Sequence, residues 1–228
     1  MRYLLLFFTI FFLNLGNAQE VITKKVDIKN FEFYETYDDY VINNIMKPAV
    51  SAYVHRETSK YFTINKYLFT ETDTKAKKAA SAWCFKYENG IYLNMINAAW
   101  IGQWDTFVKF DIVGKKYMVI LLNEDTDWRA IGHYSKYGGG LTEVLINASI
   151  KPKSSWKDKN DNKFKILFVD VENPMRADQI KKNEVFADLL DTKKVLELYN
   201  NDEAVVKKLK DNDFKVEDFI EFVTNANI

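Results

Sequence analysis

The chain has 228 residues, of which 32 are basic and 32 are acidic, and 15% are aromatic. This balance of charge gives no electrostatic reason to expect nucleic acid or an anionic membrane surface as a partner. The many large aromatic side chains argue against disorder and favour a packed core rich in β-sheet.

The first 18 residues have the pattern of a secretory signal peptide. Arg2 precedes a mostly apolar stretch, residues 4–13, and small residues stand before the junction of Ala18 and Gln19. An uncleaved anchor is the alternative, but this stretch is well short of the ~20 residues that span a bilayer. We therefore predict cleavage between Ala18 and Gln19, export to the periplasm or beyond, and no membrane span in the mature chain.

The next elements are predicted from local signals. Residues 31–35 alternate in the manner of a short strand, and Thr36 with Asp39 has the spacing of a capping box that starts a helix. Residues 61–69 are rich in β-branched and aromatic types, which favours another strand.

Two hairpins follow. Asn89-Gly90 suits a tight turn, which would pair Tyr87 with Tyr92. This places Trp83, Phe85, Tyr87, Tyr92 and Ile96 on one face, and Cys84, Lys86, Leu93 and Met95 on the other. Gly114 would open a second turn that pairs Val113 with Lys116. One unbroken apolar face is then expected, made of Val108, Phe110, Ile112, Tyr117, Val119 and Leu121.

The rest of the chain changes from strand to helix. Residues 141–150 fit strand or helix, and we favour strand; residues 164–171 are typical of a buried strand. Helices are predicted at 192–200, at 203–210 and around 216–223, the last with Asp213 as its cap.

These elements predict one α+β domain over residues 19–228. It consists of a mainly antiparallel sheet built from hairpins, a short helix near the start, and C-terminal helices packed on the sheet. Residues 19–183 form the sheet-rich part, and residues 184–228 form the helical tail.

Motifs for metal, cofactor or covalent chemistry are incomplete. The two alternations of oxygen ligands, residues 123–127 and 158–162, lack the glycine and the closing glutamate of a calcium loop. Two histidines and the single Cys84 do not make a zinc site. His133 near Ser135 lacks the context of a hydrolase, and the glycines at 138–140 lack the residues of a phosphate loop. We expect no metal and no cofactor, and a buried, unreactive Cys84.

Aromatic and hydrogen-bonding residues gather in a region with little strand periodicity. Exposed aromatic rings of this kind stack on sugars or hold extended peptides, whereas buried rings look the same in sequence. The candidate ligand-binding residues are Trp100, Trp104, Trp128, Arg129, His133 and Tyr134.

The order of these segments resembles a group of secreted proteins of Bacteroidota whose domain has no assigned function. The resemblance covers about residues 31–225 and rests on five segments: FYETYDDYVINN, WCFKYENGIYLNM, FVKFDIVGKKYMVILL, ILFVDVEN and the tail from VLELYNN to IEFV. The resemblance implies an exported protein of α+β architecture and supplies no catalytic residues.

The sequence therefore favours a non-catalytic envelope domain that binds a saccharide, a peptide or an envelope protein. The alternatives are a secreted enzyme on saccharide or peptide, which needs converging carboxylates in a cleft, and a structural subunit with an open strand edge or apolar patch.

Overall fold

The computed structural model describes residues 27–98, 105–128, 131, 154–177 and 184–228. It is mostly antiparallel sheet with a few helices, as predicted. The strands are β1 (Asp27–Tyr34), β2 (Val50–Glu57), β3 (Tyr61–Phe69), β4 (Cys84–Tyr87), β5 (Gly90–Asn94), β6 (Thr106–Lys109), β7 (Ile112–Val113), β8 (Tyr117–Asn123), β9 (Trp156–Lys157), β10 (Lys163–Asp170), β11 (Arg176–Ala177), β12 (Glu184–Val185) and β13 (Asp188–Leu189). The helices are α2 (Tyr37–Val41), α5 (Thr192–Leu198), α6 (Glu203–Lys210) and α7 (Val216–Ala226), with short turns η1 (Lys77–Ser81), η2 (Met95–Asn97) and η3 (Glu124–Trp128).

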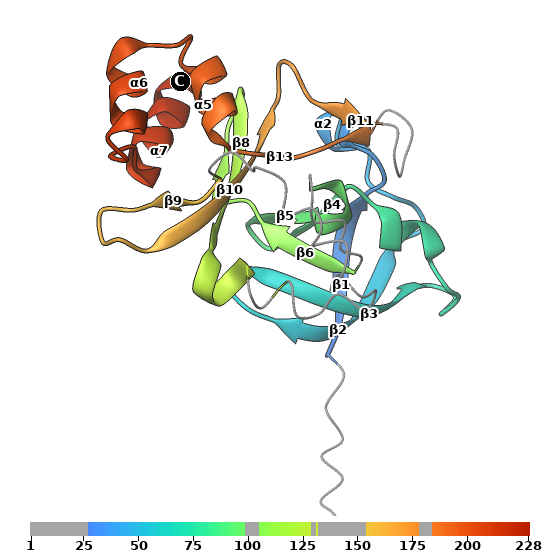
Figure 1. Cartoon of the computed structure of the whole chain (residues 1–228). Coiled ribbons are helices and arrows are strands. Elements are labelled where there is room, and N and C mark those ends of the chain that lie inside the picture. Colours follow the sequence, from blue (N-terminus) through green and yellow to red (C-terminus); the bar gives the residue numbers. More distant parts are fainter. Residues whose placement is uncertain (1–26, 99–104, 129–130, 132–153, 178–183) are drawn as a thin grey trace, which may run out of the picture.

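Six strands close into a small barrel in the order β1-β2-β3-β6-β5-β4 (Figure 1). Every neighbouring pair is antiparallel, and irregular pairing between β2 and β3 around Val54 bends the sheet. Closure leaves none of these six strands as an open edge. Neither β2 nor this closure was predicted from the sequence.

The barrel interior is filled with aromatic rings. Phe85 is central, with ring centroids 4.4 Å from Phe31, 4.8 Å from Phe107 and 5.0 Å from Tyr92. The aromatic members of this cluster are Phe31, Phe33, Phe62, Tyr67, Phe85, Tyr92 and Phe107, with Tyr87 packed against them. Offset and edge-on ring contacts of this kind account for the large aromatic content of the chain.

A second sheet, in the order β13-β10-β8-β7 with β9 also paired to β10, lies between the barrel and the helices. Met118, Ile120 and Leu122 of β8 pack toward the barrel, whereas Tyr117 and Val119 pack toward α5 and α7. Both faces of the strand are therefore covered, which explains its continuous run of apolar residues. Figure 1 shows the resulting layers, with the red helices and the blue and green barrel on either side of β8 and β10.

Both predicted hairpins form, but each predicted register is wrong by two residues. Tyr87 pairs with Gly90, and the turn passes through Glu88, which has a positive φ of 51°. Gly90 lies within the ladder, at a position where a Cβ would come within 2.6 Å of the Tyr92 ring. A shift of two keeps each side chain on its face, so Phe85 and Tyr92 still share the barrel interior. Trp83 does not join them, because it precedes β4 and packs outside the barrel.

The second hairpin pairs Val113 with Met118, again two residues from the prediction. Gly114 stands where a Cβ would overlap the Asn227 carboxamide, at 2.1 Å. The expected single apolar face is wrong as well, because β6 stays in the barrel and the chain enters the second sheet after it. The residues of this expected face instead belong to two clusters. Val108 and Phe110 pack between the barrel and the second sheet, whereas the others pack between the second sheet and the helices: Ile112, Tyr117, Val119 and Leu121.

The predicted helices are confirmed, with one correction to a cap. Thr36 and Asp39 form the reciprocal capping box of α2. Helix α7 is not capped by Asp213, since Lys215 stands at its N-cap and the Asp218 carboxylate accepts the Lys215 N–H at 2.8 Å. The first helix of the tail begins at Thr192, and the stretch from residue 184 before it contains β12 and β13. Residues 141–150 lie outside the described residues.

Two buried indoles hold the segment from Val185 to Leu190, which contains β13 of the second sheet and precedes α5. The Trp83 Nε1–H donates to the Val185 carbonyl and the Trp156 Nε1–H donates to the Leu190 carbonyl, each at 2.8 Å. Both tryptophans are fully buried, so each bond satisfies a carbonyl that water cannot reach. The segment from Val185 to Leu190 is thereby fixed to both neighbouring clusters.

Cys84 is buried and free, as predicted. Burial raises the pKa of its thiol well above the usual value, which disfavours the reactive thiolate. No helix within the described residues is both long and apolar enough to cross a membrane.

Candidate functional site

Of the six predicted ligand-binding residues, the structure describes only Trp128. The others, Trp100, Trp104, Arg129, His133 and Tyr134, lie outside the described residues, as do Ala18 and Gln19 at the predicted cleavage site. Trp128 ends η3, a single turn of π-helix, and its partly buried ring packs against the cluster between the barrel and the second sheet. The ring therefore contributes to packing, and the Lys165 ammonium lies 6.0 Å from its centroid.

A polar network surrounds Trp128. The Lys165 Nζ donates to Ser154 Oγ at 3.0 Å and lies 3.3 Å from the Glu124 carboxylate, to which Ser155 also donates. An ammonium that donates to a serine hydroxyl cannot remove its proton. This arrangement therefore ties η3 to β10 and to the segment before β9, and Lys165 does not act as a base toward Ser154.

The acidic loops use their oxygens within the chain. Asp158 Oδ1 accepts the backbone N–H groups of Asn160 and Asn162, both at 2.8 Å, and Asn123 Oδ1 accepts those of Asp125 and Thr126. These are the hydrogen bonds of polar turns. In the described part of the chain, no three His, Cys, Asp or Glu side chains converge as a metal site would require.

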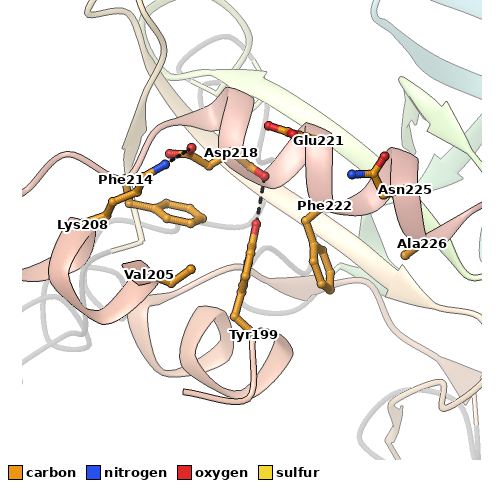
Figure 2. Close-up of a pocket in the computed structure, with 9 residues that line it drawn as sticks. All are labelled: Tyr199, Val205, Lys208, Phe214, Asp218, Glu221, Phe222, Asn225 and Ala226. Atoms are coloured by element: carbon orange, nitrogen blue, oxygen red, sulfur yellow. Dashed lines mark hydrogen bonds and ion pairs between the residues drawn. The ribbon is translucent and has the colours of Figure 1, made fainter. Parts of the chain in front are cut away.

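A groove of about 530 Å³ lies among the three C-terminal helices (Figure 2). Its walls are mostly apolar, and its polar groups stand on α6 and α7. The lining residues are Tyr199, Val205, Lys208, Phe214, Asp218, Glu221, Phe222, Asn225 and Ala226. The three helices were predicted from the sequence, but the groove between them was not.

The turns between these helices determine the shape of the groove. Asn200 and Asn201 after α5 and Asn212 after α6 adopt positive φ angles, of 52°, 57° and 55°. Asparagine tolerates this left-handed conformation better than most residues, so the chain can reverse without glycine. Asp202 then begins α6 by accepting the N–H groups of Ala204 and Val205.

Aromatic rings form one side of the groove. Tyr199 and Phe222 have ring centroids 4.5 Å apart, and Phe214 meets the edge of Tyr199 at 5.8 Å. The Tyr199 hydroxyl donates to the backbone carbonyl of Asp218 at 2.9 Å and so joins α5 to α7 (Figure 2). Because this hydroxyl is already engaged, the side of the groove around Tyr199 offers a ligand mainly apolar surface.

Carboxylates act on two titratable side chains of the groove. Burial raises the pKa of Tyr199, and the charges of Asp218 and Glu221 raise it further. The pKa of Lys208 is raised as well, first by its 2.6 Å hydrogen bond to Asp218, with contributions from the charges of Asp218, Asp213 and Glu221 that burial partly opposes. Each shift has the sign expected beside carboxylates, which disfavour phenolate and favour ammonium.

One sequence signal could have indicated the groove. The apolar stripe of α7 runs through Val216, Phe219, Ile220 and Val223, and Phe222 falls at its flank. A large ring at the flank of this stripe needs a partner at the edge of the core between the second sheet and the helices, where Phe222 also meets Tyr117 at 5.8 Å. The sequence alone, however, does not show that Tyr199 and Phe214 supply it.

Comparison with known proteins identifies no relative of this chain. No family model, no curated protein and no solved structure matches this chain.

Proposed function

We propose that this protein is a non-catalytic binding domain of the bacterial envelope, and that the aromatic groove among α5, α6 and α7 holds its partner. The groove itself is the observation that supports this proposal. Ligand sites are commonly concavities of about 300–1,000 Å³ with apolar walls and a few polar groups, and this groove fits that description. The Asp218 carboxylate on its rim accepts from Lys208 and from the Lys215 N–H, so it is held in structural contacts and does not face the groove as a free acid or base.

Export is part of the proposal and has its own test. Protein recovered from its source should begin near Gln19 when its amino terminus is sequenced, because the apolar stretch before it suits removal by signal peptidase. A mature product that retains Met1 would contradict export by this route.

The binding role is tested by obstructing the groove. In Asn225→Trp an indole replaces an exposed lining residue of α7, and we expect it to fill the mouth of the groove. We would select peptides that bind the unaltered protein from a displayed library of random dodecamers. These peptides should bind Asn225→Trp at least about tenfold more weakly, because the indole would keep them from the contacts inside the groove that contribute most to binding.

Thr224→Trp is the matched control. Thr224 is the exposed neighbour of Asn225 on the same helix and does not line the groove, so this variant gains the same indole on a different face. It should retain the selected peptides. Selected peptides that bind Asn225→Trp unchanged would contradict the proposal, and mass spectrometry that finds them cleaved or modified would support the enzyme alternative instead.

A further inference from the structure

The charged side chains around the groove differ in whether they have a partner within the protein. The Asp218 carboxylate is fully engaged, with Oδ1 bound to Lys208 and Oδ2 bound to the Lys215 N–H. Lys208 is in turn neutralised by this pair. Within the described residues, no hydrogen bond or ion pair engages the exposed Glu221 carboxylate on the same rim. One negative charge is therefore left to meet a ligand.

Helix α7 adds to this charge. Asn225 and Ala226 lie in its last turn and line the groove, so the negative end of the helix dipole lies beside the groove, while the C-cap residue Asn227 contacts the turn between β7 and β8. No basic residue stands in that last turn to offset it. A cation placed between Glu221 and the end of α7 would meet both sources of negative potential.

The apolar wall next to this rim suits a hydrophobic side chain. Phe222 and Tyr199 present a tilted ring pair, and Val205 and Ala226 extend the apolar lining. An anchor side chain inserted here would lose its contact with water, while a neighbouring cation could also lie over an aromatic face.

Resting on the proposed binding role of this groove, we infer that its ligand is a segment of a partner protein in which a large apolar side chain adjoins an arginine or lysine. The apolar side chain packs against Tyr199 and Phe222, and the cation pairs with Glu221. An acidic segment is disfavoured because it would face an unpaired carboxylate and the negative end of α7.

Three dye-labelled decapeptides in a glycine and serine background test this inference by fluorescence anisotropy. The first contains a phenylalanine followed by two arginines. The second replaces both arginines with citrulline, which is neutral and nearly isosteric, and the third replaces the phenylalanine with serine. The first should bind most tightly, and raising the salt from about 0.05 M to about 0.5 M should weaken it toward the citrulline peptide, because salt screens exposed charge pairs.

Glu221→Gln provides the decisive comparison. It should weaken the arginine peptide about three- to fivefold, the size expected for one exposed ion pair, and leave the citrulline peptide unchanged. Glu32→Gln makes the same change of charge at an exposed position of β1 in the barrel and should alter neither peptide. Both variants should keep the melting temperature of the unaltered protein.

The outcomes separate this inference from the proposed function. If Asn225→Trp blocks the peptides but Glu221→Gln affects the arginine and citrulline peptides equally, the groove binds and the preference for a cation is overturned. If Asn225→Trp blocks none of them, the binding role of the groove fails too. A dimer in sedimentation velocity that Asn225→Trp dissociates would identify a second copy as the occupant and also overturn the inference.

Discussion

Replacement of Trp83 by alanine is expected to lower the free energy of unfolding by about 3–5 kcal/mol, the range for truncating a buried tryptophan. Trp83 is fully buried, and its ring meets Tyr37 edge-on at 4.9 Å and Tyr40 at 5.4 Å. Its truncation would leave a cavity between the barrel and the second sheet. It would also remove the indole donor from the Val185 carbonyl.

Urea denaturation followed by circular dichroism measures this loss, and Cys84 provides a second readout. Because the buried thiol is unreactive in the folded state, its labelling at pH 8 reports opening of this cluster and should accelerate in Trp83→Ala. Trp83→Phe keeps a ring but loses the hydrogen bond, so it should cost about 1–3 kcal/mol. An alanine variant as stable as the phenylalanine variant would mean that the ring does not fill this space.

Replacement of Phe214 by alanine is expected to cost about 3–5 kcal/mol and to remove ligand binding with it. Phe214 is buried between Trp156, at 5.1 Å, and Tyr199, at 5.8 Å, and it also lines the groove. The same ring therefore holds the tail on the second sheet and forms part of the binding surface.

Hydrogen exchange followed by mass spectrometry distinguishes the two effects. In Phe214→Ala, peptides from residues 192–226 should exchange faster, whereas barrel peptides should keep their protection, because the ring contacts the helices and not the barrel. Phe214→Leu conserves most of the volume and should cost less than about 1.5 kcal/mol. Equal acceleration across the whole chain would show that the tail does not open separately from the barrel.

The elements that were predicted correctly depend on neighbours along the chain. The helix after Thr36, the strand at residues 61–69 and the three tail helices each follow from a cap, a periodicity or a composition within about ten residues. The hairpins were placed correctly for the same reason. Their registers were not, because Gly90 makes room for the Tyr92 ring and Gly114 for Asn227, 113 positions later in the chain.

The candidate site was predicted less well than the fold. The aromatic region was selected for its composition, and its one described member, Trp128, packs on the core. The groove instead combines Tyr199, Phe214 and Phe222 from three parts of the tail. Each of these residues alone fits an ordinary amphipathic helix or its boundary.

The amino-acid sequence by itself determined the local preferences of this protein: alternating apolar residues for strands, side-chain caps for helices, and enough aromatic surface to require a large core. Only the tertiary structure decided that β1 to β6 close on themselves, that the chain passes from β6 into a second sheet, and that three helices leave a groove whose Glu221 carboxylate pairs with none of the described residues. The physical reason is the distance along the chain over which each kind of interaction acts. Dihedral preferences and caps act between near neighbours, whereas closure and concavity depend on which distant side chains exclude water together.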